Sequence, residues 1–315
     1  MSPIRYIITH SSLSSLMMGI GAVLAGTASA AIRGNTEYMP ATLCIIFVVC
    51  AQMSANMYYR YYDVTHNCGN NIDEGNSSKA VREMLMHLKE YSTGMFLLAV
   101  MTGMAIITMA GAWSLMLGAF IVVAGWLSSG GSLPLLRTPY GIVCSFIFFG
   151  PVCVISTSLI QSMHEASQPL NWYDITPALY MSLAIGLMCI NSTMLYGYAS
   201  YYRDLRNSKA SFVTLCGRRI TRIIFIVNGA LYTAIIIGMC YSLHLNIYSL
   251  EMTPSVLCFI IDIYIWWKMR TLPRYKDYTL IDVGNFNVLL MGLLSFLIFE
   301  ITGVPDDSRL TFFGL

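Results

Sequence analysis

The chain repeatedly presents apolar segments about as long as a lipid bilayer is thick, and this recurrence most constrains its fold. A helix needs roughly 20 mostly apolar residues to cross a membrane. This length predicts nine spans, at 13–32, 41–60, 94–112, 114–130, 141–162, 176–199, 222–243, 253–268 and 285–303. Residues 94–130 are too many for one helix, so we divide them at the Gly-Ala pair 111–112. We therefore predict an all-α polytopic membrane protein in which residues 1–315 form a single domain.

The composition excludes a soluble globular domain. Hydrophobic residues make up 56% of the chain and charged residues only 11%, whereas soluble domains carry about 25% charged residues. The nine cysteines form no CxxC pair and mostly lie in apolar runs, which favours buried thiols over a metal site or disulfides. We expect no nucleic-acid partner, because a basic face on a membrane protein meets anionic lipid first.

The basic residues orient the chain in the membrane. With nine spans, 16 of the 18 Lys and Arg residues fall at the N-terminus or in the loops after spans 2, 4, 6 and 8. Only Arg33 and Arg309 fall on the other side. The positive-inside rule makes the basic side, and with it the N-terminus, cytoplasmic. Two loops on that side, 61–93 and 200–221, are long and contain interleaved apolar residues, so we expect short helices lying over the cytoplasmic face.

Polar residues gather where spans 2 and 6 reach the cytoplasm. Asn56, Arg60 and Asp63 share one helical face, because they are four and three residues apart. The second cluster is YYRDLRNSK at 201–209. Cations from both clusters would suit a phosphate or diphosphate in one cavity, since Arg binds such groups with two hydrogen bonds. Two alternatives stay open: juxtamembrane Arg, Lys and Tyr also serve as membrane anchors, and Asp204 could only neutralise a neighbouring arginine.

Asp262, Asn191 and Asn228 fall inside predicted spans. Asp262 is about two turns from Lys268, so we expect it to reach the membrane surface or to pair with a basic side chain. Asn191 and Asn228 are expected to form interhelical hydrogen bonds.

Two motifs in the middle of the chain resemble a known family. The segment GGSLPL at 130–135, followed by FFGPV at 148–152 in the next span, is similar to the UbiA superfamily of membrane prenyltransferases. The branch that it most resembles prenylates 1,4-dihydroxy-2-naphthoate in menaquinone synthesis. The resemblance extends over nearly the whole chain and implies nine transmembrane helices with a cytoplasmic N-terminus. It also implies an integral protein of a bacterial cytoplasmic membrane that transfers a polyprenyl group from a polyprenyl diphosphate to an aromatic acceptor.

The resemblance further implies a Mg²⁺ site, which this chain matches only in part. In the family, aspartate-rich motifs at the ends of helices 2 and 6 hold Mg²⁺, which holds the diphosphate. Asn56 matches the first motif, but three other residues stand where aspartates are expected: Met57, Arg60 and His66. In the second motif Arg203 and Asp204 match, Lys209 takes the position of a lysine, and Ser200 and Tyr201 replace two asparagines. About one family carboxylate in five remains in register.

These departures leave several interpretations. The enzyme is active with substitute ligands drawn from Asp63, Asp73, Glu74 and Asp204; or it is active with less metal, and Arg60 pairs directly with the diphosphate. Alternatively, it has lost catalysis and binds a lipid or a partner protein, or it is another polytopic protein such as a transporter. For an enzyme, we predict three groups of site residues. The metal or its water shell is bound by Asn56, Asp63 and Asp204, and the diphosphate by Arg60, Lys79, Arg203 and Lys209. The cavity wall or an interfacial belt contains Tyr58 and Tyr62.

Overall fold

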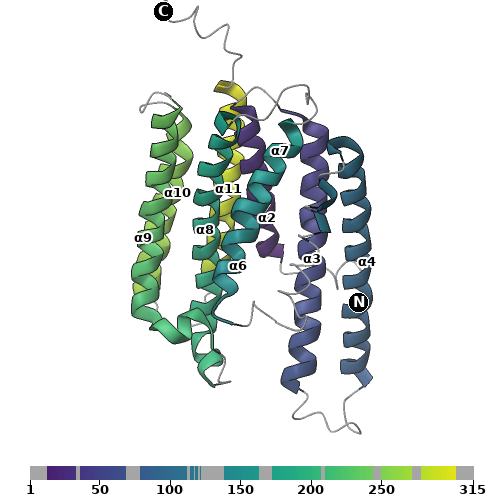
Figure 1. Cartoon of the computed structure of the whole chain (residues 1–315). Coiled ribbons are helices and arrows are strands. Elements are labelled where there is room, and N and C mark those ends of the chain that lie inside the picture. The colour runs from purple at the N-terminus through teal and green to yellow at the C-terminus, as the bar shows by residue number, and fades with distance from the viewer. Residues whose placement is uncertain are drawn as a thin grey trace, which may run out of the picture.

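The computed structural model is an elongated bundle of helices that run alongside one another (Figure 1). It describes residues 13–32, 36–68, 79–111, 114–116, 118–119, 121, 138–162, 172–206, 210–243, 250–271 and 278–302, which include no β-strand. The long helices are α2 (Leu13–Ala31), α3 (Tyr38–Cys68), α4 (Lys79–Ala110), α8 (Trp172–Arg206), α9 (Phe212–Ser242), α10 (Thr253–Thr271) and α11 (Tyr278–Thr302). A further span is composite, with α6 (Gly141–Ile147), the π-helical segment η2 (Phe148–Ile155) and α7 (Ser156–Ser162). A 3₁₀ turn, η4 (Leu250–Met252), precedes α10.

The predicted spans largely agree with these helices. Within the described residues, eight helices are long and apolar enough to cross a membrane. The remaining prediction, 114–130, lies mostly outside the described residues. The break predicted before it is confirmed at Gly111, which follows the end of α4 and has a φ of 87°. Glycine adopts this conformation without the steric cost that a Cβ would bring.

The first cytoplasmic loop differs from the prediction. α3 extends to Cys68 and α4 begins at Lys79, so the described parts of 61–93 continue the membrane helices instead of forming short helices over the cytoplasmic face. The second loop agrees better, because α9 starts with a short helical segment that ends at a break at Gly217 (φ 77°, ψ 159°). Ser211 and Thr214 cap this segment reciprocally, each side chain accepting a hydrogen bond from the other's backbone N–H, at 3.2 and 2.7 Å.

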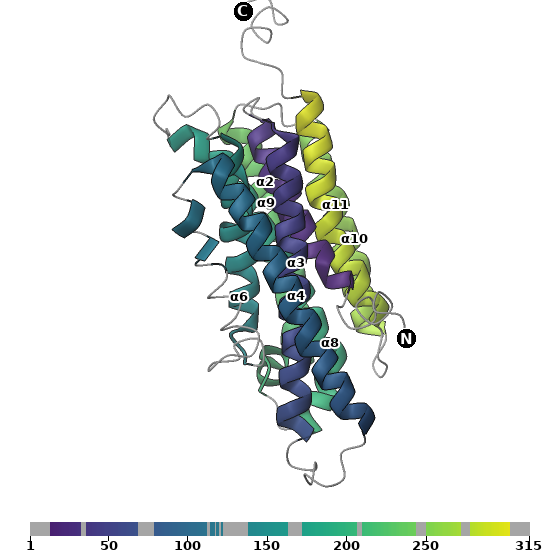
Figure 2. The same ribbon diagram turned by 90° about the vertical axis from the view of Figure 1, so that its right-hand side faces the viewer.

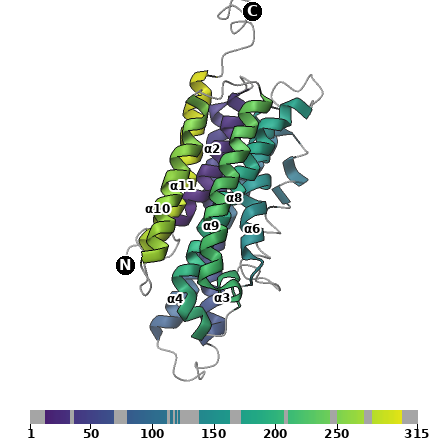
Figure 3. The same ribbon diagram turned by 90° about the vertical axis from the view of Figure 1, so that its left-hand side faces the viewer.

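Helices α2 and α8 lie at the centre of the bundle. α2 packs against α3, α7, α8, α11 and η2, while α8 packs against α6, α9, α11 and η2. Figure 2 shows α3 and α4 on one side of this centre, and Figure 3 shows α9 and α10 on the other. Glycines permit the closest contacts: a Cβ on Gly292 of α11 would overlap the backbone of Gly21 in α2, and one on Gly150 of η2 would overlap the carbonyl oxygen of Ser182 in α8. Small residues allow such close approach between membrane helices.

One end of the bundle carries most of the described basic residues. The C-terminal ends of α3, α8 and α10 lie there beside the N-terminal ends of α4, α9 and α11 (Figure 1). We call it the basic end; it carries Arg60, Arg203, Arg206, Arg218, Arg219, Arg222, Lys268 and Arg270. This is the end that the positive-inside rule assigns to the cytoplasm.

Candidate active site

A cavity of about 700 Å³ lies between α3, α4, the composite span and α8. Its α3 wall consists of residues three and four apart, which therefore share one helical face: Cys44, Phe47, Val48, Ala51, Gln52, Ala55, Asn56 and Tyr59. Its α8 wall has the same spacing and includes Thr193, Tyr196, Gly197, Ser200, Arg203 and Asp204. Two regular helices thus turn one face each toward a common space.

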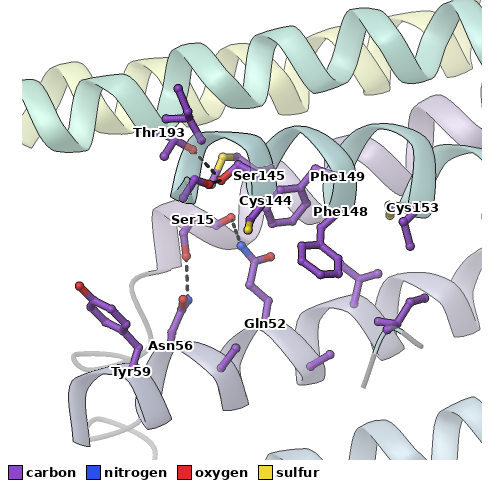
Figure 4. Close-up of a pocket in the computed structure, with 18 of the residues that line it drawn as sticks. Ser15, Gln52, Asn56, Tyr59, Cys144, Ser145, Phe148, Phe149, Cys153 and Thr193 are labelled. Atoms are coloured by element: carbon purple, nitrogen blue, oxygen red, sulfur yellow. Dashed lines mark hydrogen bonds between the residues drawn. The ribbon is translucent and has the colours of Figure 1, made fainter. Parts of the chain in front are cut away.

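The cavity changes from polar to apolar along its length. Toward the basic end, its wall contains Asn56, Tyr59, Ser200, Arg203 and Asp204, and we call this part the polar half. Away from the basic end, the wall contains Phe47, Phe148, Phe149, Val152 and Ile160, and we call this part the apolar half. Figure 4 shows Asn56 and Tyr59 at one end of the view, and Phe148 and Cys153 at the other. The space therefore suits a ligand with a charged head and a hydrocarbon tail.

Asp204 is the charged centre of the polar half. It lies in the last turn of α8 and is only 3% exposed. Ser200, one turn earlier, donates a hydrogen bond from Oγ to Asp204 Oδ2 at 2.8 Å. Arg203 Nε lies 3.8 Å from Asp204 Oδ1, while 67% of the Arg203 side chain is exposed. Arg203 and Arg206 also sit favourably at the negative end of the helix dipole.

The opposite wall is held by hydrogen bonds between α2 and α3. Asn56 Nδ2 donates to Ser15 Oγ at 2.8 Å, and Gln52 Nε2 donates to the Ser15 carbonyl oxygen at 2.6 Å (Figure 4). Because a carbonyl oxygen only accepts hydrogen bonds, the second contact fixes the orientation of the Gln52 amide. The start of α2 therefore positions two amide side chains of α3 at the cavity wall.

The structure brings together three residues from the two distant clusters that match the family motifs. Asn56, Arg203 and Asp204 all line the cavity, although they come from different spans. Arg60 lies one turn beyond Asn56 on α3. The side chains of Asp63 and Lys79 lie outside the described residues, as do Asp73, Glu74 and Lys209 altogether.

The tyrosines of the first cluster have different surroundings. Tyr59 lines the cavity, whereas the ring of Tyr58 stacks on Tyr61 with 6.1 Å between centroids. The Tyr62 carbonyl oxygen accepts a hydrogen bond from the Thr65 hydroxyl at 3.0 Å. The sequence alone does not distinguish these neighbours, because every tyrosine in the cluster is equally suited to a membrane interface.

Several other polar wall residues were not predicted. Thr193 Oγ1 donates to Ser145 Oγ at 2.9 Å and so connects α8 to α6 at mid-depth in the cavity (Figure 4). Tyr196 lies one turn before Ser200 on the same face of α8. The spacing of four residues from Tyr196 through Ser200 to Asp204 was the available signal for a shared polar face.

The prediction for Asp262 is wrong. It is 3% exposed and accepts hydrogen bonds from Asn287 Nδ2 at 2.9 Å and Asn191 Nδ2 at 3.3 Å. Lys268 is six residues farther along α10, a rotation of about 240°, and therefore faces another direction. Its ammonium lies near the Tyr264 and Trp267 rings, 5.8 and 5.6 Å from their centroids.

The predicted interhelical role of two asparagines is confirmed in the same cluster. Asn228 Nδ2 donates to Asn191 Oδ1 at 3.2 Å, joining α9 to α8. Asn191 Nδ2 also lies 3.1 Å from the Phe225 carbonyl oxygen. We call Asp262, Asn191, Asn228 and Asn287 the buried polar network.

The oxygen atoms in the polar half suit a single Mg²⁺ ion as ligands. Mg²⁺ is usually bound by one or two carboxylates and takes its other ligands from water and substrate phosphates. Among the described residues that line the cavity, Asp204 is the one carboxylate. The Ser200 hydroxyl and the Asn56 amide oxygen are neutral oxygen ligands of the kind that Mg²⁺ also accepts. No group of three His, Cys, Asp or Glu side chains that could hold a metal is found within the described part of the chain.

Comparison with known proteins agrees with this architecture. Residues 19–283 match the model of the UbiA prenyltransferase family. Over 214 residues, the chain is 23% identical to the 1,4-dihydroxy-2-naphthoate octaprenyltransferase of Mycobacterium tuberculosis, which covers 67% of this chain and 70% of that protein. Over 200 residues, it is 24% identical to the protein of the same name from Mycobacterium leprae, covering 62% of this chain and 63% of that protein.

A solved structure described as digeranylgeranylglyceryl phosphate synthase shares the fold. It aligns with a TM-score of 0.53 at 14% identity and covers 96% of this chain and 99% of its own. The family model spans most of the sequence. These findings confirm three predictions: the all-helical membrane fold, the resemblance to the family and the activity of a prenyltransferase. The chain therefore belongs to the UbiA prenyltransferase family.

Proposed function

We propose that this protein transfers a polyprenyl group from a polyprenyl diphosphate to 1,4-dihydroxy-2-naphthoate, as a step of menaquinone synthesis in a bacterial cytoplasmic membrane. The observation that carries this proposal is the graded cavity, which joins a polar half at the basic end to an apolar half within the bundle. A diphosphate head and an isoprenoid tail match these two halves. The names of the mycobacterial relatives support the choice of acceptor.

In this proposal, the polar half holds the diphosphate. The Arg203 guanidinium forms charge-assisted hydrogen bonds to phosphate oxygens. Arg60, Lys79 and Lys209 would add positive charge, and Asp63 would supply a second carboxylate. Members of the family generally use divalent metal ions, and here Asp204, with Asn56, would hold Mg²⁺. When bound, Mg²⁺ neutralises charge on the departing diphosphate.

The apolar half holds the isoprenoid tail and excludes water. As the bond between the allylic carbon and the diphosphate weakens, that carbon gains positive charge, and water would capture it as an alcohol. The cavity wall is apolar here, with Phe148, Phe149 and Val152. An aromatic acceptor therefore competes with little water for the allylic carbon. Phe rings also stabilise a nearby cation through their π-electrons.

The test is a transfer assay with the purified full chain in proteoliposomes. Radiolabelled octaprenyl diphosphate and 1,4-dihydroxy-2-naphthoate are supplied with Mg²⁺ or with EDTA, and the prenylated product is extracted and counted. We expect product with Mg²⁺ and loss of at least about 90% of it with EDTA, because Asp204 needs the ion to engage the diphosphate. Product that survives EDTA would favour direct pairing of the diphosphate with arginines.

The single carboxylate among the described cavity residues also favours a second candidate, a family member that binds a polyprenyl lipid without turnover. The same proteoliposomes separate the two candidates. Retention of labelled octaprenyl diphosphate without product, across a panel of hydroxylated aromatic acceptors and both metal conditions, would support the binding protein. It would overturn the proposed transfer.

A further inference from the structure

Tyr196 occupies an unusual place on the wall between the two halves of the cavity. It lines the cavity from α8 and lies eight residues before Asp204. Eight residues of α-helix correspond to a distance of about 12 Å along the axis. Tyr196 is therefore deeper in the cavity than Arg203 and Asp204, and we expect the allylic carbon of a bound donor to meet an acceptor near this depth.

The Tyr196 hydroxyl is held by two other helices. Asn285 Nδ2, on α11, donates to Tyr196 Oη at 2.9 Å, and Ser14 Oγ, on α2, lies 3.5 Å from the same oxygen. Asn285 Nδ2 also donates to Ser14 Oγ at 3.2 Å, which closes a triangle of three side chains. Asn285 is fully buried, at 0% exposure. These contacts at the hydroxyl restrict the orientation of the ring.

A ring fixed in this way is preorganised for an aromatic ligand. Aromatic pairs favour offset-stacked or edge-to-face contacts, which add to the affinity from apolar burial alone. A binding surface that is rigid before the ligand arrives loses little conformational entropy on binding. Phenylalanine would present the same ring but would lack the link to Asn285, which explains why a tyrosine suits this position.

The wall across the same level of the cavity is also fixed. Gln52 and Asn56 are both hydrogen-bonded to Ser15, and Ser15 neighbours Ser14 of the Tyr196 triangle. The start of α2 therefore connects both walls. Tyr196 on one wall and Gln52 and Asn56 on the other are thus all held in place by hydrogen bonds.

We propose that Tyr196 binds the ring of the aromatic acceptor, with Asn285 and Ser14 as the residues that position it. This inference rests on the proposed function and adds the acceptor subsite to it. The donor diphosphate binds farther toward the basic end, so its affinity does not depend on the Tyr196 ring. Tyr196 acts on the acceptor by direct contact, whereas Asn285 acts only through Tyr196.

The first experiment separates acceptor binding from donor binding. The Tyr196→Leu variant removes the ring, and steady-state transfer is measured with 1,4-dihydroxy-2-naphthoate and octaprenyl diphosphate varied in turn. We expect the acceptor KM to rise about tenfold, the value of one aromatic contact, while the donor KM stays within about twofold. An unchanged acceptor KM in folded Tyr196→Leu would overturn the inference and leave the proposed transfer intact.

The second experiment tests the positioning link without removing the ring. Tyr196→Phe and Asn285→Leu each break the same hydrogen bond, so each should raise the acceptor KM about threefold. The double variant should raise it no further than the larger single effect, because both changes remove one interaction. If the effects of Tyr196→Phe and Asn285→Leu on the acceptor KM add, the role of Asn285 is overturned. This test does not require Tyr196→Leu to fold.

Tyr198 gives a matched control on the same helix. Its hydroxyl donates to the Met269 carbonyl oxygen of α10 at 2.7 Å, but it is buried outside the cavity wall. Tyr198→Phe should lower thermal stability and leave the acceptor KM unchanged. A rise equal to that of Tyr196→Phe would mean that both tyrosines act only by holding α8, and would overturn the subsite.

A binding measurement keeps this inference separate from the proposed transfer. Titration of 1,4-dihydroxy-2-naphthoate into wild-type protein and Tyr196→Leu, in the same detergent, needs no turnover. Weaker binding by about tenfold in the variant would support the subsite even if the wild type forms no product. Equal binding by the two proteins would overturn it.

Discussion

Asp204 and Asp262 are both buried, hydrogen-bonded carboxylates in membrane helices, yet their surroundings differ in free volume and in charge. Asp204 faces a cavity of about 700 Å³ and has a hydroxyl and an arginine beside it. Asp262 faces two asparagine amides across a gap that has no room for a water molecule. Burial of a carboxylate in the membrane therefore does not by itself indicate a binding site. Free volume and neighbouring cations distinguish the site from the structural cluster.

The difference also divides the bundle into two functional parts. The cavity lies on the side of α3, α4 and the composite span, whereas the buried polar network joins α8, α9, α10 and α11. α8 belongs to both, because Asn191 faces the network and Thr193 faces the cavity. The network therefore contributes to the packing of α8, whereas the opposite face of α8 lines the cavity, and the following changes test this division.

The largest effect is expected from Asp204→Asn. The amide preserves the shape of the side chain and a hydrogen bond with Ser200 but removes the negative charge. We expect kcat/KM for transfer to fall by about 10² to 10³, the usual loss when one electrostatic contact to a reacting group is removed. Transfer assays and thermal unfolding of the same preparation provide the measurement. Activity within threefold of wild type would place the reaction elsewhere.

The next effect is expected from Arg203→Ala. Removing the guanidinium should raise the donor KM about tenfold, because a charge-assisted hydrogen bond to phosphate is lost at a partly solvated position. Arg206→Ala is the matched control, since Arg206 ends the same helix and is not among the described residues lining the cavity. Equal donor KM values for the two variants would mean that both arginines act only through the general positive potential of the basic end.

A smaller effect on activity is expected from Asp262→Leu. The change leaves the Asn191 and Asn287 amides without their shared acceptor, so the free energy of unfolding should fall by about 1–2 kcal/mol. Transfer per folded molecule should stay within about twofold of wild type. Thermal unfolding in detergent and the transfer assay measure the two quantities. Loss of transfer at unchanged stability would contradict the division between network and cavity.

The smallest effect is expected from Asn228→Leu. Asn228 is partly buried and donates one hydrogen bond to Asn191, so about 0.5 kcal/mol of stability should be lost. Asp262→Leu and Asn228→Leu share Asn191, and a double-mutant cycle should reveal coupling between them. Simple additivity would show that the buried polar network is a set of independent contacts.

The membrane spans could be predicted well because lipid imposes a strong local rule on sequence. Every span needs a long apolar run, and a break such as Gly111 is visible without knowledge of its neighbours. The helix ends were less predictable, since α3 and α4 continue into polar sequence. Outside the bilayer, contacts between helices stabilise these helix ends. Hydropathy does not depend on such contacts and therefore does not predict where the helices end.

The cavity could be predicted only in part, from the two polar clusters and from the family motifs that the chain matches. Asn56, Arg203 and Asp204 were found because residue type and position coincide with a known pattern. Tyr196 and Thr193 depend on which face of α8 meets α2, α6 and α11, and that pairing is a property of the whole bundle. Asp262 was misjudged for a related reason: distance along the sequence was considered, but rotation around α10 was not.

The π-helical segment η2 has a consequence for how this protein tolerates changes in length. Every fourth residue of the composite span lines the cavity, namely Ser145, Phe149, Cys153 and Thr157. In a regular α-helix each such step would advance about 40° around the axis, whereas the wider turns of η2 reduce this drift. The number of residues in η2 therefore sets the rotation of α7 relative to α6, and with it whether Thr157 faces the cavity. Natural relatives should therefore vary in the residues of this segment more readily than in its number of residues.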